Sequence, residues 1–575
     1  MIKNLEEKEK ILNLIKLDEH NSRLIDEIAK NIQLDYINFL SALGSSNERK
    51  VDWWVLNFVS RNTFISNLFR NVCYLLLVKK NLESGITYDE IIVGSIYLKN
   101  LLRKFCQENE LDTRVVYKGK KLLYLYFKRN YNYIKVLLNF FYRWFASWIV
   151  NKDKKGSSLN GDIILIDTFV HKNDFVDNIY KNHYYPRLFN YLNSEEKKYI
   201  YFVPEYYGVK NYVKLFIDIR NCKQKFLLKE DYLKLKDYFF ALLFPFRIKL
   251  FQLGKKSFKE FNIFPLIKEE IFNDCASSSS MCGLLNYRFT ERLKDKNIKL
   301  KTIINWFENQ AIDHGFNIGF RLFYPKTILK GYLGFPAHNN YLSLYPTEQE
   351  VKARVIPNEI NVIGKGYINI IKKFSHNLTV EAAPAFRYIN IWRKMKYSPS
   401  KNFFSVLIAL PMLVDQLDEI IDLMLKVAES NKINKKYVFK IKVHPTQNIK
   451  FLKQRWKGRK LDKFKFIRRD FQECLDEADV LITYASSVCL ETIARGIPVI
   501  VLANRLGLTQ LPIPENLKQN IWKLCYTPED IIKSIEYYAK IDKSDDHFKK
   551  IGHEVRKNFF EPVTKKSVRK FLGIQ

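Results

Sequence analysis

The chain has 575 residues, more than a single hydrophobic core usually organises, which predicts two or three domains. Hydrophobic residues make up 47% of the chain and charged residues 27%, so it can bury a sizeable core and global disorder is excluded. The 95 Lys and Arg against 61 Asp and Glu give a net charge of +34, which favours a polyanionic partner (nucleic acid, an anionic membrane surface or a phosphorylated substrate) unless it reflects only a Lys-rich composition.

The eight cysteines are scattered and include no C-x-x-C pair, so neither a zinc site nor a disulfide framework is expected. Reduced thiols in the cytoplasm fit this pattern. The first residues, Met1–Glu7, are charged and do not resemble a secretory leader, and no run of ~20 apolar residues could span a bilayer. We therefore expect a cytoplasmic protein that is soluble or peripheral to a membrane.

The first part of the chain, residues 1–156, is expected to be a mixed region that is largely helical up to about residue 85. Strands are predicted at Glu90–Ser95 and Arg114–Tyr117, followed by a long basic and aromatic segment. The polar run Asn151–Ser158 indicates an exposed linker to the next domain.

Two stretches combine aromatic and apolar residues with a basic residue inside, Val136–Val150 and Tyr238–Leu253. Both are too short and too charged to span a bilayer. One interpretation is a helix buried against the core. The other is a helix in the interface of an anionic membrane, with Lys and Arg at the headgroups. In that case the inserted side chains would be those of Phe140, Phe141, Trp144 and Trp148.

Residues 157–398 alternate apolar runs with helical stretches, which is typical of a parallel sheet covered on both faces. We expect this domain to carry the acceptor side of the site. The predicted strands are Ile163–Ile166, Tyr199–Val203, Thr302–Ile304, Ile328–Leu329 and Ile360–Ile363. The segment Lys396–Lys401 breaks the pattern and marks the main domain boundary.

A second alternation fills residues 399–575 and predicts a doubly wound, Rossmann-like domain that binds the donor nucleotide at the carboxyl ends of its strands. Helices are expected near residues 414–430, 471–477, 487–495 and 528–540. The predicted strands are Phe404–Ala409, Tyr437–Lys442, Lys465–Ile467, Val480–Thr483 and Pro498–Val501.

The first motif with chemical meaning is Lys442-Val443-His444-Pro445, at the end of a predicted strand. Pro445 ends the strand ladder, so His444 should lie at the carboxyl edge of the sheet, where ligands of such folds bind. There His444 and Lys442 could donate hydrogen bonds to a phosphate. The alternative is a structural histidine with its hydrogen bonds satisfied inside the fold.

The second motif is a strand that ends in Ser486-Ser487 and continues as a helix. Free N–H groups and the helix dipole favour an anion at that point, and two hydroxyls add donors. Glu491, one turn into the helix, could accept hydrogen bonds from ribose hydroxyls. Ordinary helix capping by serine is the alternative.

K-x-H-P and S-S, followed by L-E-x-x-A-x-G-x-P-V, resemble the donor half of GT-B-fold transferases of bacterial capsules and surface polysaccharides. These include polysialyltransferases, Kdo transferases and CDP-glycerol polyol-phosphate transferases. The resemblance covers roughly residues 400–540. It implies a GT-B architecture, two Rossmann-like domains facing a cleft, and a cytidine nucleotide held by His444, Pro445, Ser486 and Ser487. It does not distinguish a CMP-sugar from a CDP-polyol.

The candidate base lies in the segment Trp306–Gly315. Sialyltransferase members of the group carry an acidic-acidic-Gly motif, which Asp313-His314-Gly315 matches only in part. Glu308 and Gln310 match a Trp-x-Glu-x-Gln segment of similar proteins. An inverting transfer needs one carboxylate to take the proton of the acceptor hydroxyl. We expect Glu308 to serve as that base, with Asp313 as the alternative, unless one of them only caps the following helix.

No D-x-D triplet occurs in the sequence, so we expect neither a metal clamp nor another cofactor, and His444 would stabilise the leaving phosphate. We therefore expect an inverting, metal-independent glycosyltransferase that moves a sugar from a CMP-activated donor to a glycan or lipid-linked acceptor. A transferase of polyol phosphate from a CDP-polyol is the enzymatic alternative. A nucleic-acid-binding protein is disfavoured, since the basic residues are spread over the whole chain without a binding signature. A non-catalytic, transferase-like scaffold also remains open.

Overall fold

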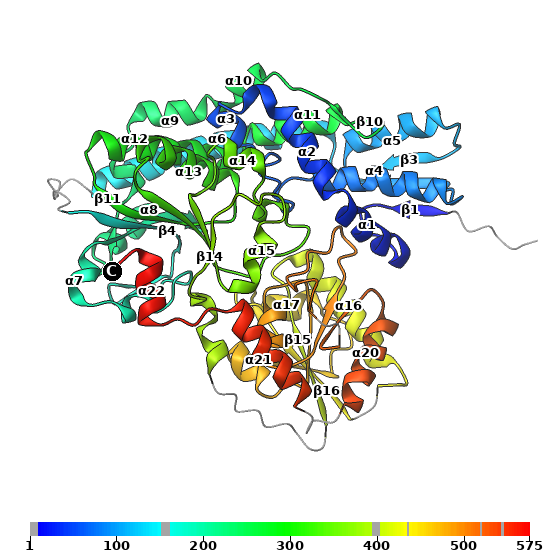
Figure 1. Cartoon of the computed structure of the whole chain (residues 1–575). Coiled ribbons are helices and arrows are strands. Elements are labelled where there is room, and N and C mark those ends of the chain that lie inside the picture. Colours follow the sequence, from blue (N-terminus) through cyan, green and yellow to red (C-terminus); the bar gives the residue numbers. More distant parts are fainter. Residues whose placement is uncertain are drawn as a thin grey trace, which may run out of the picture.

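The computed structural model describes residues 10–150, 161–393, 403–433, 436–517, 520–541 and 546–574. Three segments discussed above lie outside these residues: the charged segment Met1–Glu7, the predicted linker Asn151–Ser158 and the predicted boundary Lys396–Lys401. Among the described helices, none has both the length and the hydropathy that a bilayer crossing requires. The described chain forms two α/β halves and a small N-terminal unit that touches both (Figure 1).

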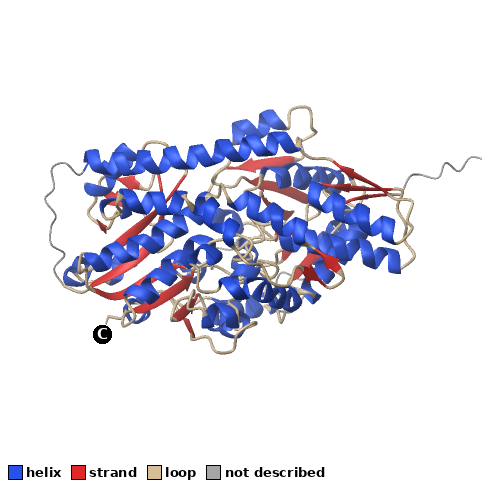
Figure 2. Cartoon of the chain, turned by 90° about the horizontal axis from the view of Figure 1, so that it is seen from above, coloured by secondary structure: helices blue, strands red, loops and turns tan. Residues whose placement is uncertain are grey.

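The N-terminal half is built on a seven-stranded parallel sheet. Its central strands are nearly continuous runs of buried apolar residues, as expected for a sheet covered by helices on both faces (Figure 2). Helices α8 (Tyr212–Arg220), α12 (Ser278–Asp295) and α13 (Ala311–Phe323) belong to this half. In spatial order the strands are β14 (Val380–Ala382), β13 (Glu359–Val362), β12 (Ile328–Leu333), β11 (Leu300–Trp306), β4 (Ile163–His171), β7 (Ile200–Tyr207) and β8 (Lys225–Phe226).

The C-terminal half is a six-stranded parallel sheet. The chain starts in the middle at β15, moves outward to β17, and then crosses to β18 on the other side of β15. The strands in spatial order are β17 (Phe464–Ile467), β16 (Tyr437–Lys442), β15 (Phe404–Ala409), β18 (Val480–Tyr484), β19 (Val499–Leu502) and β20 (Trp522–Cys525). The helices of this half are α16 (Val414–Glu429), α17 (Ile449–Arg455), α18 (Phe471–Leu475), α19 (Val488–Ile493) and α20 (Pro528–Lys540).

These two doubly wound sheets confirm the predicted α/β class and GT-B arrangement. Both sheets change winding direction once, between β4 and β11 in the N-terminal half and between β15 and β18 in the C-terminal half. Such switch points are where open α/β sheets bind ligands, beyond the carboxyl ends of the strands. The predicted strands lie within one or two residues of most observed ones. The edge strands β8, β14 and β20 and the helix α17 were not predicted.

The N-terminal extension is mainly helical, as expected, and adds a small three-stranded parallel sheet. It bridges the two halves. Asp26 accepts a hydrogen bond from the backbone N–H of Thr509 at 2.8 Å, and Arg61 forms a buried ion pair with Glu350 at 2.8 Å. Its elements are β1 (Ile11–Asn13), α1 (Glu19–Asn31), α2 (Gln33–Gly44), α3 (Val51–Trp54), α4 (Leu68–Glu83), β2 (Glu90–Val93), α5 (Ile96–Glu108) and β3 (Arg114–Tyr117).

The end of the chain returns to the N-terminal half. After α21 (His547–Phe559), helix α22 (Lys565–Leu572) leaves the C-terminal sheet and packs beside the N-terminal one (Figure 1). The ring of Phe571 lies 5.1 Å from that of Tyr332 and 5.6 Å from that of Phe386. The two halves are thus joined at both ends of the molecule, by the extension and by α22.

Candidate functional site

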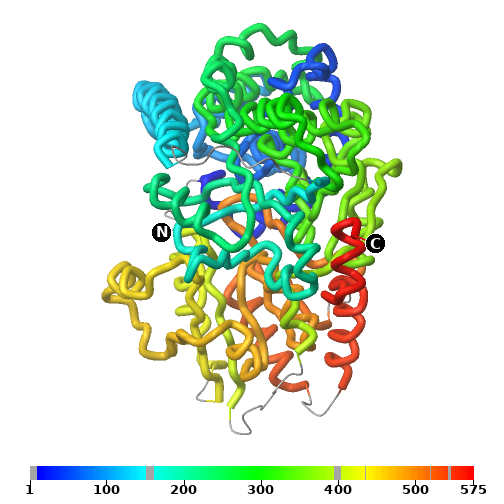
Figure 3. Tube along the Cα trace, turned by 90° about the vertical axis from the view of Figure 1, so that its left-hand side faces the viewer, coloured from blue at the N-terminus to red at the C-terminus, as the bar shows by residue number. Residues whose placement is uncertain are grey.

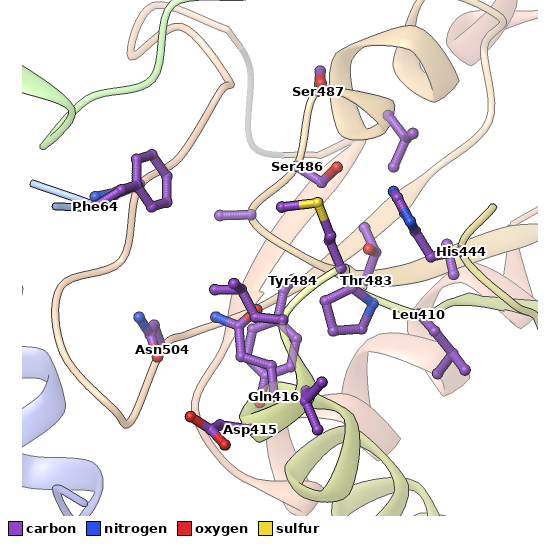
Figure 4. A pocket seen from close by; sticks show the side chains of 18 of the residues that line it. Phe64, Leu410, Asp415, Gln416, His444, Thr483, Tyr484, Ser486, Ser487 and Asn504 are labelled. Atoms are coloured by element: carbon purple, nitrogen blue, oxygen red, sulfur yellow. The ribbon is translucent and has the colours of Figure 1, made fainter. Parts of the chain in front are cut away.

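A cavity of about 1280 Å³ lies at the carboxyl edge of the C-terminal sheet. The segments that follow β15, β16, β17, β18 and β19 all contribute to its wall. The opposite wall comes from the N-terminal half and the extension, with His338 after β12, Arg387 after β14, and Phe64. Residues beyond the carboxyl ends of strands in both sheets therefore line one cavity. Figure 4 shows its C-terminal wall from close by, with Phe64 of the extension across from it.

The cavity is centred on the switch point between β15 and β18. After β15, Leu410-Pro411-Met412-Leu413 leads into α16, whose first residues Val414, Asp415 and Gln416 line the cavity. After β18, Ala485-Ser486-Ser487 leads into α19. The first N–H groups of a helix have no partner inside that helix, so two sets of N–H donors point towards this edge.

His444 lines the cavity, as predicted, together with Lys442 and Pro445. The backbone N–H of Thr446 donates to Nδ1 of His444 at 3.3 Å, and the hydroxyl of Thr446 lies 2.7 Å from the same atom. Because a backbone N–H can only donate, Nδ1 is the acceptor and the ring proton of neutral His444 is on Nε2. Burial, with a contribution from Lys442, lowers the pKa of His444, so the ring is neutral near pH 7 and offers one N–H.

Ser486 and Ser487 also line the cavity (Figure 4). Ser487 is the N-cap residue of α19, yet its side chain makes no capping hydrogen bond. Both serines are partly exposed. The hydroxyl of Ser487 therefore does not cap helix α19, which is the ordinary role of a serine at this position. The arrangement places hydroxyls and first-turn N–H groups at one end of the cavity.

The charged side chains around the cavity are mainly basic. Five cations face two carboxylates, those of Asp415 and Asp470, so the site favours an anionic ligand. Arg469 is already paired with Glu477 at 2.6 Å. The cations are Arg70, Arg387, Lys442, Arg468 and Arg469.

Glu491, expected to contact the ribose, is not part of the cavity wall. Its carboxyl group accepts a hydrogen bond from Gln472, and burial raises its pKa to about 7. Gln472 in turn accepts from Arg495 at 2.7 Å. Glu491 thus belongs to a polar network behind α19.

Glu308 follows β11, at the switch point of the N-terminal sheet, and is partly exposed. Glu308 is not among the residues that line the cavity. Its carboxylate accepts hydrogen bonds from Trp306 Nε1 (2.9 Å), Gln310 Nε2 (2.6 Å) and the hydroxyl of Tyr341 (3.3 Å).

Two contacts connect this carboxylate to the cavity wall. The guanidinium of Arg387 lies 5.9 Å from the ring centre of Trp306, and the ring of Phe64 lies 4.8 Å from that of Tyr341. Two side chains therefore separate Glu308 from the cavity on each path, Trp306 and Arg387 on one and Tyr341 and Phe64 on the other.

Asp313 caps the start of helix α13, which was the structural alternative to a role as the base. It is buried in the first turn of α13 and accepts the backbone N–H groups of Glu308 and Gln310, each at 3.0 Å. Burial raises its pKa to about 8, so the group is largely protonated near neutral pH. This arrangement favours Glu308 over Asp313 as a base.

His338 is a site residue that the sequence analysis missed. Its Nδ1 lies 3.0 Å from the carbonyl oxygen of Gln510, which can only accept, so Nδ1 carries the ring proton and Nε2 is a free acceptor. Burial lowers its pKa to about 4. His338 lies in a loop five residues after β12, where no motif marks it, and no motif marks Phe64 or Arg387 either. Asp415 and Gln416 were detectable, since a helix was predicted directly after the strand Phe404–Ala409.

No family model matches the sequence, and a search of curated proteins finds no match either. Among solved structures, similar folds include the UDP-GlcNAc 2-epimerase of Neisseria meningitidis bound to UDP-GlcNAc (11% identity, 72% of this chain and 99% of that chain, TM-score 0.39). MurG of Acinetobacter baumannii shows 10% identity over 72% of this chain and 99% of that one, with a TM-score of 0.38. A variant of the wall teichoic acid polymerase TagF shows 9% identity over 78% and 96%, with a TM-score of 0.37. Similarities at this level do not identify a donor or an acceptor for the chain.

Proposed function

We propose that the chain is a glycosyltransferase that transfers a sugar from a cytidine-nucleotide donor to a glycan or lipid-linked acceptor. One observation carries the proposal. The Nε2–H of His444, Lys442, the two serines and the first N–H groups of α19 converge on one cavity at the switch point of a doubly wound sheet. At about 1280 Å³ the cavity exceeds the ~300–1,000 Å³ of ordinary ligand pockets, which leaves room for a donor and the end of an acceptor.

The proposed reaction is a single displacement with inversion. The acceptor hydroxyl loses its proton to a base of the N-terminal half, and its oxygen bonds to the anomeric carbon of the donor sugar. The bond from that carbon to the phosphate oxygen breaks, and the nucleotide leaves with the electron pair. The donors around His444 and Ser486 stabilise the negative charge that develops on the phosphate.

Glu308 is the proposed base, because it alone of the two expected carboxylates is partly exposed and lies at the switch point of the N-terminal sheet. The hydrogen bonds of Trp306, Gln310 and Tyr341 hold its carboxylate in one orientation. A rearrangement of Tyr341 and the neighbouring Phe64 would expose the carboxylate of Glu308 to an acceptor. Such a change is expected on substrate binding, because catalytic hydrogen bonds often reach their final geometry only in the complex.

The assignment of cytidine as the base of the donor nucleotide rests on the resemblance of Lys442–Pro445 and Ser486–Ser487 to cytidine-dependent transferases. Measuring the unfolding temperature in the presence of different nucleotides tests this assignment. We expect CMP or CDP to raise the unfolding temperature more than UDP or GDP. A ligand present at a hundredfold excess over its Kd stabilises the folded state by ~2.7 kcal/mol. CMP leaves in both reactions, so the two donor classes are separated by which compound, a CMP-sugar or a CDP-polyol, releases CMP in the presence of the acceptor. A stronger response to UDP would show that the cytidine assignment is wrong.

Transfer is expected to be independent of divalent metal ions. The expectation rests on the sequence, which contains no D-x-D triplet. Release of CMP from CMP-activated sugars, measured in excess EDTA, should equal release without EDTA. Loss of activity in EDTA and its recovery with Mg²⁺ or Mn²⁺ would contradict the metal-independent mechanism.

A further inference from the structure

Helix α6 (Leu122–Val150) has its polar contacts on the side that faces the protein. Arg143 forms a buried ion pair with Glu230 at 2.6 Å, and Ser147 donates to Asp231 at 2.6 Å. Nearer the start of the helix, the hydroxyl of Tyr133 donates to the carbonyl oxygen of Leu242 at 2.7 Å. These contacts determine which face of the helix is turned to solvent (Figure 3).

The solvent face of α6 carries a continuous stripe of large apolar side chains. They recur every three or four residues, which places them on one face of the helix. Their exposed fractions range from 37% to 68%. The stripe consists of Leu123, Phe127, Tyr131, Ile134, Leu138, Tyr142, Phe145 and Ile149. Polar contacts inside and apolar side chains outside are the reverse of what a helix on a water-exposed surface normally shows.

A second apolar stripe runs along α9 (Leu235–Leu242), α10 (Phe244–Arg247) and the short helix Ile248–Leu250. Its side chains are 43% to 74% exposed and again recur every three or four residues. They are Leu235, Phe239, Leu243, Phe246 and Leu250. Phe141, one helical turn from Leu138 and Phe145 of the first stripe, has its ring 6.5 Å from that of Phe239 in the second, so α6 and α9 lie side by side. Together they form one surface, called here the α6–α10 surface.

The charges of these two segments are almost all positive. Seven Lys or Arg and no Asp or Glu occur from Lys118 to Val150, and six Lys or Arg with a single acid occur from Lys234 to Lys256. Two of these thirteen cations are neutralised by acids of other segments, Arg143 by Glu230 and Arg247 by Asp52. The single acid, Asp237, is buried and bound by Arg288 and Arg292. The α6–α10 surface therefore combines exposed apolar side chains with a strong excess of positive charge.

We propose that the α6–α10 surface docks onto an anionic lipid bilayer, with the two stripes between the headgroups and the acyl chains. Soluble proteins rarely expose contiguous apolar patches of this extent without a partner. At an anionic membrane interface the apolar side chains are removed from water and the cations meet negatively charged headgroups. Pairing with a second copy would bring two positively charged surfaces together, which like-charge repulsion opposes. The proposal is independent of the donor and of the reaction proposed above.

The structure changes which aromatic residues would enter the membrane. Of the four expected to insert, Phe140 is in the core at 2% exposure, and Phe141 and Trp144 are partly buried against it. Only Trp148 is well exposed, at 50%, stacked on Phe145. The face that meets lipid is instead the one that carries Phe127, Leu138 and Phe145.

Sedimentation of the full chain with vesicles tests the proposal. We expect binding to phosphatidylcholine vesicles that contain phosphatidylglycerol, weaker binding without it, and a salt-resistant remainder. The variant Phe127→Ser/Leu138→Ser/Phe246→Ser should lose the salt-resistant part, with overall binding reduced about tenfold or more. The variant Lys128→Glu/Lys135→Glu/Lys249→Glu should lose the dependence on phosphatidylglycerol. All six side chains are exposed, so both variants should fold.

The matched control is Phe451→Ser/Tyr537→Ser, which changes two exposed aromatic residues of the C-terminal half and should leave vesicle binding unchanged. Wild-type binding by the folded serine variant would overturn the proposal, and so would the absence of any vesicle binding at low salt. A third contradicting outcome is a dimer, seen by light scattering, that the serine variant converts to monomers, because the surface would then pair with a second copy.

Discussion

Replacing His444 by Ala should lower the rate of transfer by about 10²–10³-fold while the protein stays folded. The Nε2–H of His444 is placed to bind the phosphate, because Thr446 occupies Nδ1. The gain from this donor is largest in the transition state, when charge develops on the leaving phosphate, so turnover should fall more than CMP affinity. The side chain lies at the sheet edge and supports no core, and unfolding temperature should change little. Release of CMP from the donor, followed over time, measures the effect.

Four further variants make this result specific. His444→Gln retains an N–H donor near the position of Nε2 and should recover part of the rate. His553→Ala removes an exposed histidine on α21 and should have no effect. Ser486→Ala should be milder than the double change with Ser487→Ala, since the backbone N–H groups of α19 remain. A folded His444→Ala protein with full activity would exclude the phosphate role.

Glu308→Gln should lower turnover by ~10²–10⁴-fold, the usual cost of losing a general base, with little change in CMP affinity. The amide keeps the shape of the carboxylate and can still accept from Trp306, so the local structure should persist. The difference between turnover and affinity is the informative quantity, because the base acts on the acceptor and the nucleotide is held by the other half. Single-turnover transfer and CMP titration, on the same preparation, measure the two.

Asp313→Asn is the matched control for this change, because the same acid-to-amide replacement falls on a buried capping residue that is already largely protonated. It should leave turnover nearly unchanged. His338→Gln tests the histidine that lines the opposite wall of the cavity and whose Nδ1 is bound to Gln510. A larger loss of turnover from either of these variants than from Glu308→Gln would move the assignment to that residue.

Strand and switch-point positions were predictable because each parallel strand is a short buried run, such as Phe404–Ala409, bounded by polar turns. The positions of Lys442, His444, Ser486 and Ser487 follow directly, since residues after parallel strands meet at one sheet edge. The opposite wall was not predictable. His338 lies in a loop and Arg387 in the short 3-10 helix Phe386–Trp392 of another domain, and only tertiary packing brings them to the cavity.

The inward face of α6 could not be read from the sequence either. Its residues are apolar on both sides, so periodicity alone does not say whether Phe140 or Leu138 is buried. The deciding interactions are those of Arg143 with Glu230 and of Ser147 with Asp231, between residues more than 80 positions apart. In the same way, the sequence Trp306–Gly315 is compatible with an Asp313 that caps α13 and with an Asp313 that faces the cleft.

The return of α22 to the N-terminal half makes the order of synthesis matter for this chain. The aromatic face of Tyr185, Tyr332 and Phe386 is completed by Phe571, which is made long after the other three. At ~5–20 residues per second, the roughly 185 residues between Phe386 and Phe571 take ~10–40 s to translate. During that time the nascent N-terminal sheet exposes an apolar face that its own later sequence must cover. The N-terminal half is thus the first to be made, yet the apolar face of its sheet is complete only once α22 has been added from a much later part of the sequence.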